Sequence, residues 1–218
     1  MSGAFLQLGG PAPSLPTEGE ELLPARATAA GTLRRMLLSA LVQFADRGYH
    51  AVSVRDIARG VGVRPSSMYE HTGSKEELLL DLMVIGHEDH REWLQRALGV
   101  AGDDPLAQMD RVMRAHVEFH ATYPMLARVC NREIGSLSPA HLEKVMTIRN
   151  DSTGIILRVI EHGVHSGAFA VPDSYLAAAA IGAMGIRVAE WYTPESGIAV
   201  DDVADAYALF ARRLVGAA

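Results

Sequence analysis

Cysteine is almost absent from this chain, which limits how its fold can be stabilised. Cys130 is the single cysteine among 218 residues, so no disulfide can form within the chain and a reducing compartment is favoured. Long hydrophobic runs are also missing: the longest apolar stretch, Tyr175 to Ala189, is shorter than the roughly 20 residues of a membrane span and contains Arg187. Residues 1–16 lack the cationic start and apolar core of a signal peptide. We therefore expect a cytoplasmic protein without a membrane segment.

Recognisable catalytic motifs are missing as well. The sequence contains no Gly-x-Ser-x-Gly elbow, no phosphate-binding loop, no His-Glu-x-x-His zinc motif and no dinucleotide-binding fingerprint. We therefore expect that the protein is not an enzyme and uses no cofactor.

Nine histidines raise the question of a metal site. Two histidines three or four residues apart share one face of a helix, but without a nearby cysteine or a fixed carboxylate they make a poor metal site. The spacing therefore predicts no bound metal. The pairs with this spacing are His87 and His90, His116 and His120, and His162 and His165.

Basic residues are outnumbered, with 20 lysines and arginines against 26 acidic residues and a formal net charge of −6. Phosphate binding depends on Lys and Arg, so this balance alone argues against a nucleic-acid partner. The distribution reverses that impression, because residues 26–75 hold eight basic and three acidic residues, whereas the remainder holds 12 basic and 23 acidic. A basic part joined to a larger acidic part indicates a DNA-binding end on a body with another task.

Proline and glycine divide the chain into a short arm and a long helical part. Residues 1–26 contain four prolines and several glycines, a composition that buries little surface, so we predict a flexible N-terminal arm. From Thr28 onward, apolar residues recur at the spacing of amphipathic helices, and 49% apolar residues are enough for a substantial core. We predict an all-α fold of about nine helices with no strand.

Capping residues set the bounds of the predicted helices. Gly48 marks the end of the first helix, and Ser53 is a good N-cap for a short second helix, Val54 to Arg59. Ser74 and Glu77 fit a capping box that opens a long helix ending near Leu98. The remaining helices are predicted to begin at Pro105, Met125, Pro139, Ser174 (capped by Asp173) and Asp201 or Asp202, with a break at Tyr123-Pro124.

The segment from Val52 to Leu78 carries the most specific pattern. It reads Val-Ser-Val-Arg-Asp-Ile-Ala-Arg-Gly-Val-Gly-Val, then Arg-Pro-Ser-Ser-Met-Tyr-Glu-His-Thr-Gly-Ser-Lys-Glu-Glu-Leu. A helix, a glycine-containing turn and a second short helix from Pro65 to about His71 form a helix-turn-helix, whose second helix enters the major groove of DNA. A pair of packed helices with incidental charge is the alternative.

The same residues closely resemble the N-terminal motif of the TetR family of bacterial regulators. The match covers roughly Thr28 to Leu80 and combines, in order, the Arg-Asp-Ile-Ala helix, the Val-Gly-Val turn, the Tyr-x-His pair and the Ser-Lys-Glu-Glu-Leu capping box. Thr72 departs from the pattern, because the family usually has an aromatic residue there. The resemblance implies a DNA-binding domain over residues 27–73 and a ligand-binding and dimerisation domain over residues 74–218.

The resemblance also implies which residues bind a double-stranded, palindromic operator. Small hydroxyls at the start of the second helix permit close approach to DNA, and Tyr and His donors suit phosphates or base edges. Lys75 is expected to hold a phosphate at a helix start, which itself favours anions. The residues expected to contact DNA are Ser53, Arg55, Arg64, Ser66, Ser67, Tyr69, His71 and Lys75.

Small residues are frequent in the last two predicted helices, where they allow helix axes to approach closely. TetR-like proteins form dimers through these helices, and a symmetric contact would place two recognition helices about 34 Å apart, one turn of DNA. Packing within one subunit is the alternative. We expect a homodimer whose interface includes Ala179, Ala183, Tyr207, Phe210 and Leu214.

The middle helices are expected to enclose a cavity for a small apolar or amphipathic effector. Thioethers, aromatic rings and a few polar anchors suit an irregular apolar pocket, with ordinary core packing as the alternative for each residue. The expected lining residues are Met109, Met113, His116, Phe119, His120, Tyr123, Met125, Met146, Arg149 and Trp191.

A short C-terminal pattern bears on the class of effector. Glu190-Trp191-Tyr192-Thr193-Pro194, followed by Gly197, resembles the C-terminal pattern of TetR-type regulators of lipid and steroid catabolism, several of which answer to acyl-CoA thioesters. In that case an arginine would meet phosphates or a carboxylate, with solvated surface arginines as the alternative. The arginines considered are Arg128, Arg132, Arg149 and Arg187.

The resemblance therefore implies a repressor that binds its operator as a dimer and is released by an effector. Two alternatives remain open from the sequence. One is an all-α enzyme or carrier that uses the apolar pocket. The other is a DNA-binding regulator without a small-molecule inducer, which a fully packed body would favour.

Overall fold

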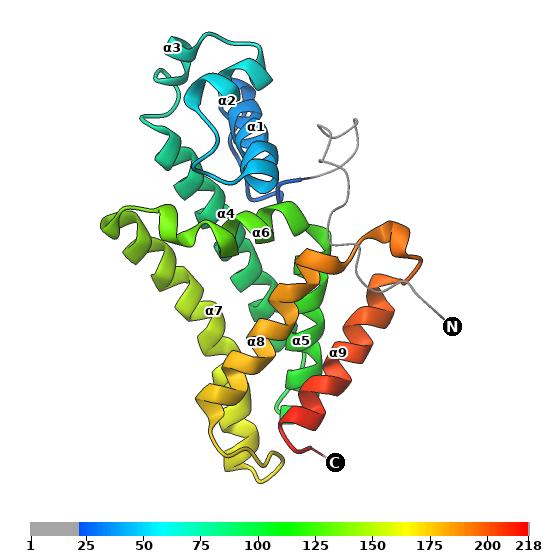
Figure 1. The fold of residues 1–218 in the computed structure, drawn as a ribbon. Coiled ribbons are helices and arrows are strands. Elements are labelled where there is room, and N and C mark those ends of the chain that lie inside the picture. The colour runs from blue at the N-terminus through cyan, green and yellow to red at the C-terminus, as the bar shows by residue number, and fades with distance from the viewer. Residues whose placement is uncertain (1–21, 218) are drawn as a thin grey trace.

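The computed structural model describes residues 22–217 of the chain. This part forms nine α-helices and two short 3-10 helices and contains no strand, as the sequence predicts (Figure 1). The helices are α1 (Gly31–Arg47), α2 (Val54–Val61), α3 (Pro65–Met68), α4 (Lys75–Gly99), α5 (Pro105–Thr122), α6 (Pro124–Arg132), α7 (Pro139–His165), α8 (Ser174–Trp191) and α9 (Val200–Leu214), with 3-10 turns at Ile134–Ser136 and Pro194–Ser196.

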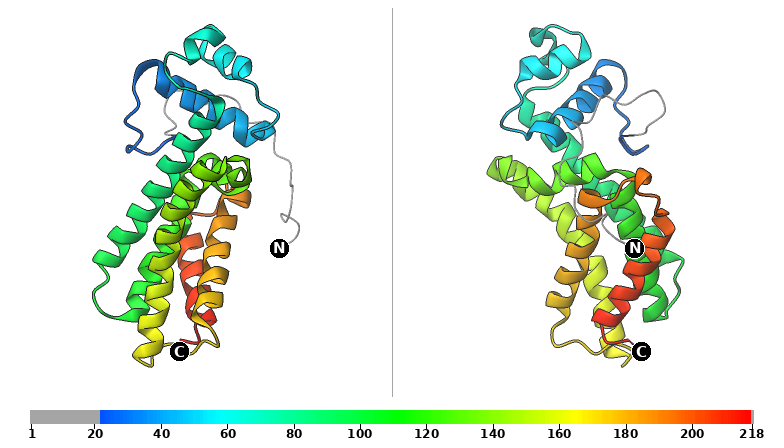
Figure 2. Two further views of the ribbon diagram at one scale, coloured as in Figure 1. Left: turned by 90° about the vertical axis from the view of Figure 1, so that its left-hand side faces the viewer. Right: turned by 45° about the vertical axis from the view of Figure 1, so that its right-hand side comes forward.

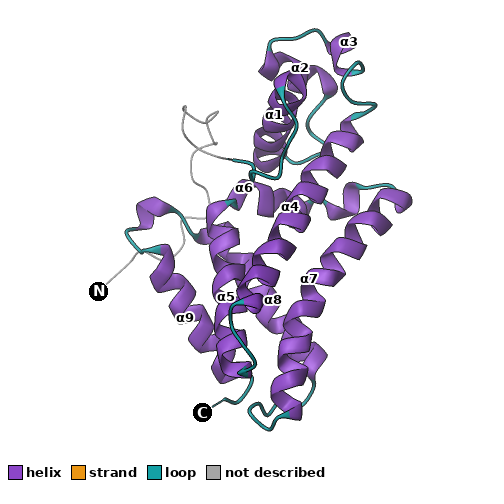
Figure 3. Cartoon of the chain, turned by 180° about the vertical axis from the view of Figure 1, so that it is seen from behind, coloured by secondary structure: helices purple, strands orange, loops and turns teal. Residues whose placement is uncertain are grey.

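The helices form a small bundle at one end of an elongated body. Helices α1, α2 and α3 make the bundle, and α4 runs from it into the body (Figure 1). Helix α6 lies across the body beneath the bundle, whereas α5, α7, α8 and α9 run lengthwise toward the opposite end (Figure 2). Seen from behind, the bundle of α1, α2 and α3 again lies at one end of the molecule, and loops connect the helices (Figure 3).

Two hydrophobic cores hold these helices together. The first joins α1, α2 and α3 to the first half of α4 and to α6, and it includes the fully buried Leu78, Met83 and Leu126. The second lies among α5, the later part of α7, α8 and α9. The domain boundary between residues 73 and 74 stays a prediction, and the first half of α4 packs with the N-terminal bundle.

Local capping explains where several helices begin. The Asp173 carboxylate accepts a hydrogen bond from the Leu176 backbone N–H at 2.8 Å, so Asp173 caps α8 as predicted. Asp104 caps α5 in the same way, through the backbone N–H groups of Leu106 and Ala107. The last helix, predicted to begin at Asp201 or Asp202, begins one residue earlier, at Val200, with Ala199 as its N-cap, and both aspartates lie in its first turn. There they still favour the helix through its dipole.

The predicted N-terminal arm, residues 1–26, falls largely outside the described residues, but its last part is described. Leu23 is fully buried in the first core. The Arg26 guanidinium pairs with the carboxylates of Glu88 and Glu92 on α4, at 2.8 and 2.7 Å. The expectation of a flexible arm therefore needs correction for residues 22–26, which are held against α4.

Among the described residues, every helix is too short or too polar to cross a membrane.

Candidate functional site

Helix α2 has both ends fixed by its own sequence. The Ser53 hydroxyl accepts a hydrogen bond from the Asp56 N–H at 3.2 Å, and the Asp56 carboxylate accepts one from the Ser53 N–H at 2.9 Å, a capping box. At the other end Gly62 adopts φ 76°, a left-handed conformation that glycine takes without strain. The helix and the glycine turn of the predicted helix-turn-helix are therefore present.

Helix α3 is shorter than the sequence predicts. It ends at Met68 rather than near His71, and Tyr69 is its C-cap. Met68 is buried and anchors the helix in the first core, whereas the Tyr69 side chain is 63% exposed. Tyr69 and His71 therefore stand at and just beyond the end of the helix, not within it.

Seven of the eight residues expected to contact DNA lie at the surface of the helix-turn-helix. Six are exposed and Ser67 is half-buried. Arg55 and Arg64 form no ion pair with any described residue, so their charges are available to a phosphate. The six exposed residues are Ser53, Arg55, Arg64, Ser66, Tyr69 and His71.

Lys75 is the exception, and the expectation that it holds a phosphate needs correction. Its Nζ donates to the backbone carbonyls of Tyr49 and Val52, at 2.9 and 2.8 Å, and lies 3.8 Å from the centre of the Tyr49 ring. Burial lowers the pKa of the Lys75 ammonium. Lys75 therefore joins the start of α4 to the loop between α1 and α2.

The start of α4 is capped much as predicted. The Ser74 hydroxyl accepts a hydrogen bond from the Glu77 N–H at 3.0 Å, and the Glu77 carboxylate accepts one at 2.6 Å from the Gly73 N–H rather than from that of Ser74. Two backbone donors are satisfied in this way.

The body contains a cavity of about 630 Å³, a size typical of small-molecule sites. Helices α4, α5, α6, α7 and α8 enclose it. The wall is largely apolar, with a few polar groups. It includes Gly86, His87, His90, His116, Phe119, His120, Ala127, Cys130, Asn131, Met146, Arg149, Ser152, Ile156, Leu157, Tyr175, Ala178, Ala179, Gly182, Ala183 and Ile186.

Half of the residues expected to line the cavity do so: His116, Phe119, His120, Met146 and Arg149. The other five lie elsewhere, because periodicity shows that a helix face is apolar but not what it packs against. Met109 and Met113 are buried in the second core, Met125 packs against the first core, Tyr123 packs against Trp93 and Phe119, and Trp191 is 44% exposed and stacks on Tyr207.

Arg149 is the cation that faces the cavity. Its guanidinium donates to the Asn131 side-chain carbonyl at 2.8 Å, and no described carboxylate pairs with it. Burial lowers the pKa of Arg149, which remains charged because a guanidinium titrates far above neutral pH. A half-buried cation without a counter-ion is partly desolvated, so an anion in the cavity would be stabilised there.

The other three arginines considered from the sequence lie outside the cavity wall. Arg132 pairs with Glu190, and Arg187 is exposed. Arg128 donates to the Ala189 carbonyl at 3.5 Å. Arg149 is therefore the best placed of the four to meet a bound anion.

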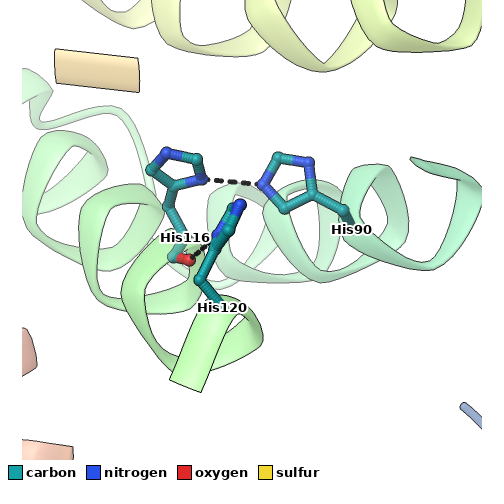
Figure 4. Close-up of side chains that lie close together, drawn as sticks. All are labelled: His90, His116 and His120. Carbon is teal, nitrogen blue, oxygen red and sulfur yellow. Dashed lines mark hydrogen bonds between the residues drawn. The ribbon is translucent and has the colours of Figure 1, made fainter. Parts of the chain in front are cut away.

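Histidines from two helices meet at the cavity wall. His116 and His120 on α5 are buried, as their spacing allows, and His90 comes to them from α4 (Figure 4). Burial lowers the pKa of His116 to about 4 and the pKa values of His90 and His120 well below the usual value, so the rings are neutral at pH 7. In the sequence, the spacing groups His90 with His87 on the same helix. Its contact with His116 and His120 on another helix could not be predicted from spacing.

Gly185 makes room for one of these rings. A Cβ atom at this position of α8 would overlap the His116 imidazole. His116 can therefore approach α8 and contact the Gly182 carbonyl, with 2.9 Å from Nε2 to the oxygen.

Two family models match this chain. One, for bacterial regulatory proteins of the tetR family, matches residues 37–82, and the other, for a tetracyclin repressor-like C-terminal domain, matches residues 102–215. The chain belongs to the TetR family.

Individual TetR-family proteins are similar to this chain over most of its length, in sequence or in fold. A tetR-family regulatory protein from Rhodococcus RHA1 is 30% identical, with a TM-score of 0.82 over 87% of this chain and 100% of its own. The HTH-type transcriptional repressor KstR2 of Rhodococcus jostii (strain RHA1) is 27% identical over 180 residues, which cover 82% of this chain and 88% of the relative. AibR, solved with isovaleryl coenzyme A and operator DNA, is 17% identical and shares the fold, with a TM-score of 0.76 over 86% of this chain and 100% of AibR.

The predicted dimer surface of this TetR protein is apolar and open. Ala179, Ala183 and Phe210 are exposed, and Tyr207 and Leu214 are half-buried. Other exposed large hydrophobic side chains on α8 and α9 are Tyr175, Leu176, Trp191 and Leu209. The interface itself stays a prediction.

Proposed function

We propose that this TetR-family protein is a repressor that binds a palindromic operator as a dimer and releases it when an amphipathic, anionic effector fills the cavity. The main support for the proposal is that α4 connects the helix-turn-helix to the cavity. This helix begins directly after the helix-turn-helix, and Gly86, His87 and His90 in its middle form part of the cavity wall. A ligand that favours another position of α4 would therefore also favour another position of the DNA-reading helix.

The surface of the helix-turn-helix supports DNA binding. Arg55 and Arg64 supply unpaired cations for phosphates, and Tyr69 and Ser66 offer donors at the tip of the domain. The basic charge concentrated in residues 26–75 agrees with this assignment.

The cavity supports release by a small molecule rather than control without an inducer. Its wall is mainly apolar, which suits an acyl chain or a ring system, and Arg149 suits an anionic head group. Acyl-CoA thioesters are the first compounds to test. The C-terminal pattern from Glu190 to Gly197 favours them, and AibR, which has the same fold, holds isovaleryl coenzyme A.

The apolar faces of α8 and α9 support a dimer. Phe210 and Leu209 are each 45% exposed. A monomer would leave these side chains of α9, and the exposed apolar side chains of α8, in contact with water. Ala179 and Ala183 belong both to the proposed interface and to the cavity wall. Only these two alanines would therefore separate a ligand in this part of the cavity from the partner subunit.

The test is a fluorescence-anisotropy titration of the purified protein with DNA from the region upstream of its own gene, over a series of salt concentrations. Tyr69→Ala is the variant, and Val100→Ala, an exposed apolar position in the turn after α4, is the matched control. We expect salt-dependent, sequence-specific binding by the wild type and the control, and loss of specific binding by Tyr69→Ala.

Acyl-CoA thioesters of graded chain length are then added to the DNA complex. Release of the operator by one chain-length class supports the proposal. Equal binding of operator and random DNA by the wild type, or unchanged affinity of Tyr69→Ala, would contradict it.

A further inference from the structure

We propose that His90, His116 and His120 form a binding site for a single divalent transition-metal ion of the zinc type, with a free coordination position that faces the cavity. One ring nitrogen from each histidine lies within 4.8 Å of the others, and all three side chains line the cavity. Figure 4 shows the rings converging from α4 and α5. Three histidines with an open fourth position are a common donor set for Zn²⁺.

The orientation of His116 favours a metal ligand. Its Nε2 lies 2.9 Å from the Gly182 carbonyl oxygen, which can only accept a hydrogen bond, so the proton of the neutral ring is on Nε2. The lone pair of His116 is then on Nδ1, the nitrogen that faces His90. Metal-binding histidines usually donate their other N–H to a carbonyl or carboxylate in this way.

His120 is oriented by the same rule. Its Nδ1 lies 2.7 Å from the His116 carbonyl oxygen, so Nδ1 carries the proton and Nε2 carries the lone pair. Two of the three rings are therefore already in the tautomer and the orientation that a metal requires, each held by a backbone carbonyl.

His90 must change tautomer when a metal binds. Its Nε2 lies 2.8 Å from His116 Nδ1, and because that atom accepts, Nε2 is the donor in the metal-free protein. Binding moves this proton to Nδ1 and leaves the Nε2 lone pair for the metal, so the three histidines themselves release no proton. Separating the two nitrogens from 2.8 Å to the roughly 3.3 Å of a tetrahedral site with bonds near 2.0 Å is a small movement.

The charge around the cluster defines the fourth ligand. Three neutral imidazoles leave the two positive charges of the ion uncompensated, and Arg149 adds a further positive charge to the same cavity. An anionic oxygen is therefore the preferred fourth ligand. When the cavity holds no other anion, a metal-bound water that gives up one proton to the solvent would supply it as hydroxide. Imidazole ligands and this geometry favour Zn²⁺, Co²⁺ or Ni²⁺ over Mg²⁺ or Ca²⁺, which prefer oxygen.

The experiment measures uptake of Co²⁺ and Zn²⁺ by the full chain after dialysis against a chelator. Tetrahedral Co²⁺ absorbs visible light strongly, so its spectrum reports the coordination geometry, and competition with a chromophoric chelator gives the Zn²⁺ affinity. The variants are His120→Gln and His90→Gln, and the control is His165→Gln, an exposed histidine near the end of α7. Circular dichroism confirms that each variant is folded.

We expect one equivalent of metal per chain, a tetrahedral Co²⁺ spectrum, and a rise in Tm with Zn²⁺. Both cavity variants should lose about tenfold or more in Zn²⁺ affinity, whereas His165→Gln should match the wild type. Failure of the wild type to bind Co²⁺ in tetrahedral form, or full affinity in His120→Gln, overturns the proposal. If no metal binds but His120→Gln weakens release of the operator by an effector, the histidines are polar contacts for the effector, and the proposed function stands without the metal.

Discussion

Glu76 on α4 and His141 on α7 are joined by a 2.7 Å contact between a carboxylate oxygen and the ring Nδ1. The same oxygen accepts a hydrogen bond from the Ser138 backbone N–H at 2.8 Å. Glu76 lies in the first turn after the helix-turn-helix, and α7 contributes Met146 and Arg149 to the cavity wall. This contact therefore connects the DNA-binding end directly to a helix of the cavity.

Replacing Glu76 should change how the free energy of unfolding depends on pH. Hydrogen bonds from Ser138 and His141 lower the pKa of Glu76 from 4.5 to about 2. A carboxyl group with a lowered pKa in the folded state stabilises the protein above pH 4.5, and this contribution is lost as the pH falls from 4.5 toward 2. Glu76→Gln should therefore be less stable than the wild type at pH 7, and the difference should shrink across this window.

Urea unfolding at pH 7, 4.5 and 3 measures this effect. Glu143→Gln, which removes an exposed carboxylate from α7, is the control for the loss of one negative charge. A Glu76→Gln variant as stable as the wild type at pH 7 would show that the contact with Ser138 and His141 contributes nothing to folding.

Lys75 should contribute to stability rather than to phosphate binding. Lys75→Met removes the ammonium donor from the part-buried carbonyls of Tyr49 and Val52, which should cost about 1 to 3 kcal/mol in the free energy of unfolding. The Tyr49 carbonyl keeps the Val52 N–H as a donor, so most of this cost should come from the Val52 carbonyl. The salt dependence of operator binding should stay unchanged. Arg64→Ala should do the reverse, with little effect on unfolding and a salt slope smaller by about 1.

Chemical denaturation and the anisotropy salt series measure these two quantities on the same samples. A reduced salt slope in Lys75→Met, with unchanged stability, would restore the phosphate role that the sequence predicted for this lysine.

Arg149 should favour ligand binding at the expense of stability. In Arg149→Met a half-buried cation without a counter-ion is replaced by an apolar chain, so the Tm of the free protein should stay equal or rise. Affinity for an anionic effector should fall about tenfold to a hundredfold, because a hydrogen-bonded charge pair is lost. Arg158→Met, an exposed arginine on the same helix, is the control.

Calorimetry of effector binding, together with thermal unfolding, tests this trade-off. Wild-type affinity in Arg149→Met would mean that the anionic group of the effector binds elsewhere.

Phe210 should be required for the dimer. A charge at this exposed apolar position of α9 would be buried without a partner in the proposed interface, so Phe210→Asp should be monomeric at micromolar concentration. Specific operator binding should fall with it, because one short recognition helix makes too few contacts alone. Val100→Asp, a substitution of an apolar residue that is more exposed than Phe210 and lies in the turn after α4, should sediment as the wild type.

Sedimentation velocity distinguishes the two states. A dimeric Phe210→Asp would place the interface on another face.

Most of the fold was predictable because its signals are local. Ser53, Asp173 and Gly62 act within a few residues of themselves, and their capping roles follow from residue type and position. The end of α3 was less predictable, since Met68 is fixed by burial in a core formed by distant helices.

The site was only partly predictable because its contacts are long-range. The ammonium of Lys75 bonds carbonyls at Tyr49 and Val52, and no pattern near Lys75 indicates this. Met109 and Met113 lie on an apolar face of α5 that packs into the second core, whereas His116 on the same helix reaches the cavity. Periodicity identifies apolar faces, but the partner of each face depends on how the helices are arranged.

Helix α4 is one unbroken rod from Lys75 to Gly99, with the cavity at its middle and the DNA-binding end at its start. From His90 to Lys75 the helix rises by about 22 Å, at 1.5 Å per residue. A tilt of about 5° at His90 therefore displaces the start of the helix by about 2 Å, whereas a hydrogen bond tolerates only a few tenths of an ångström. Under the proposed function, the length of α4 would therefore convert a small change of angle at the cavity wall into a misfit at the DNA.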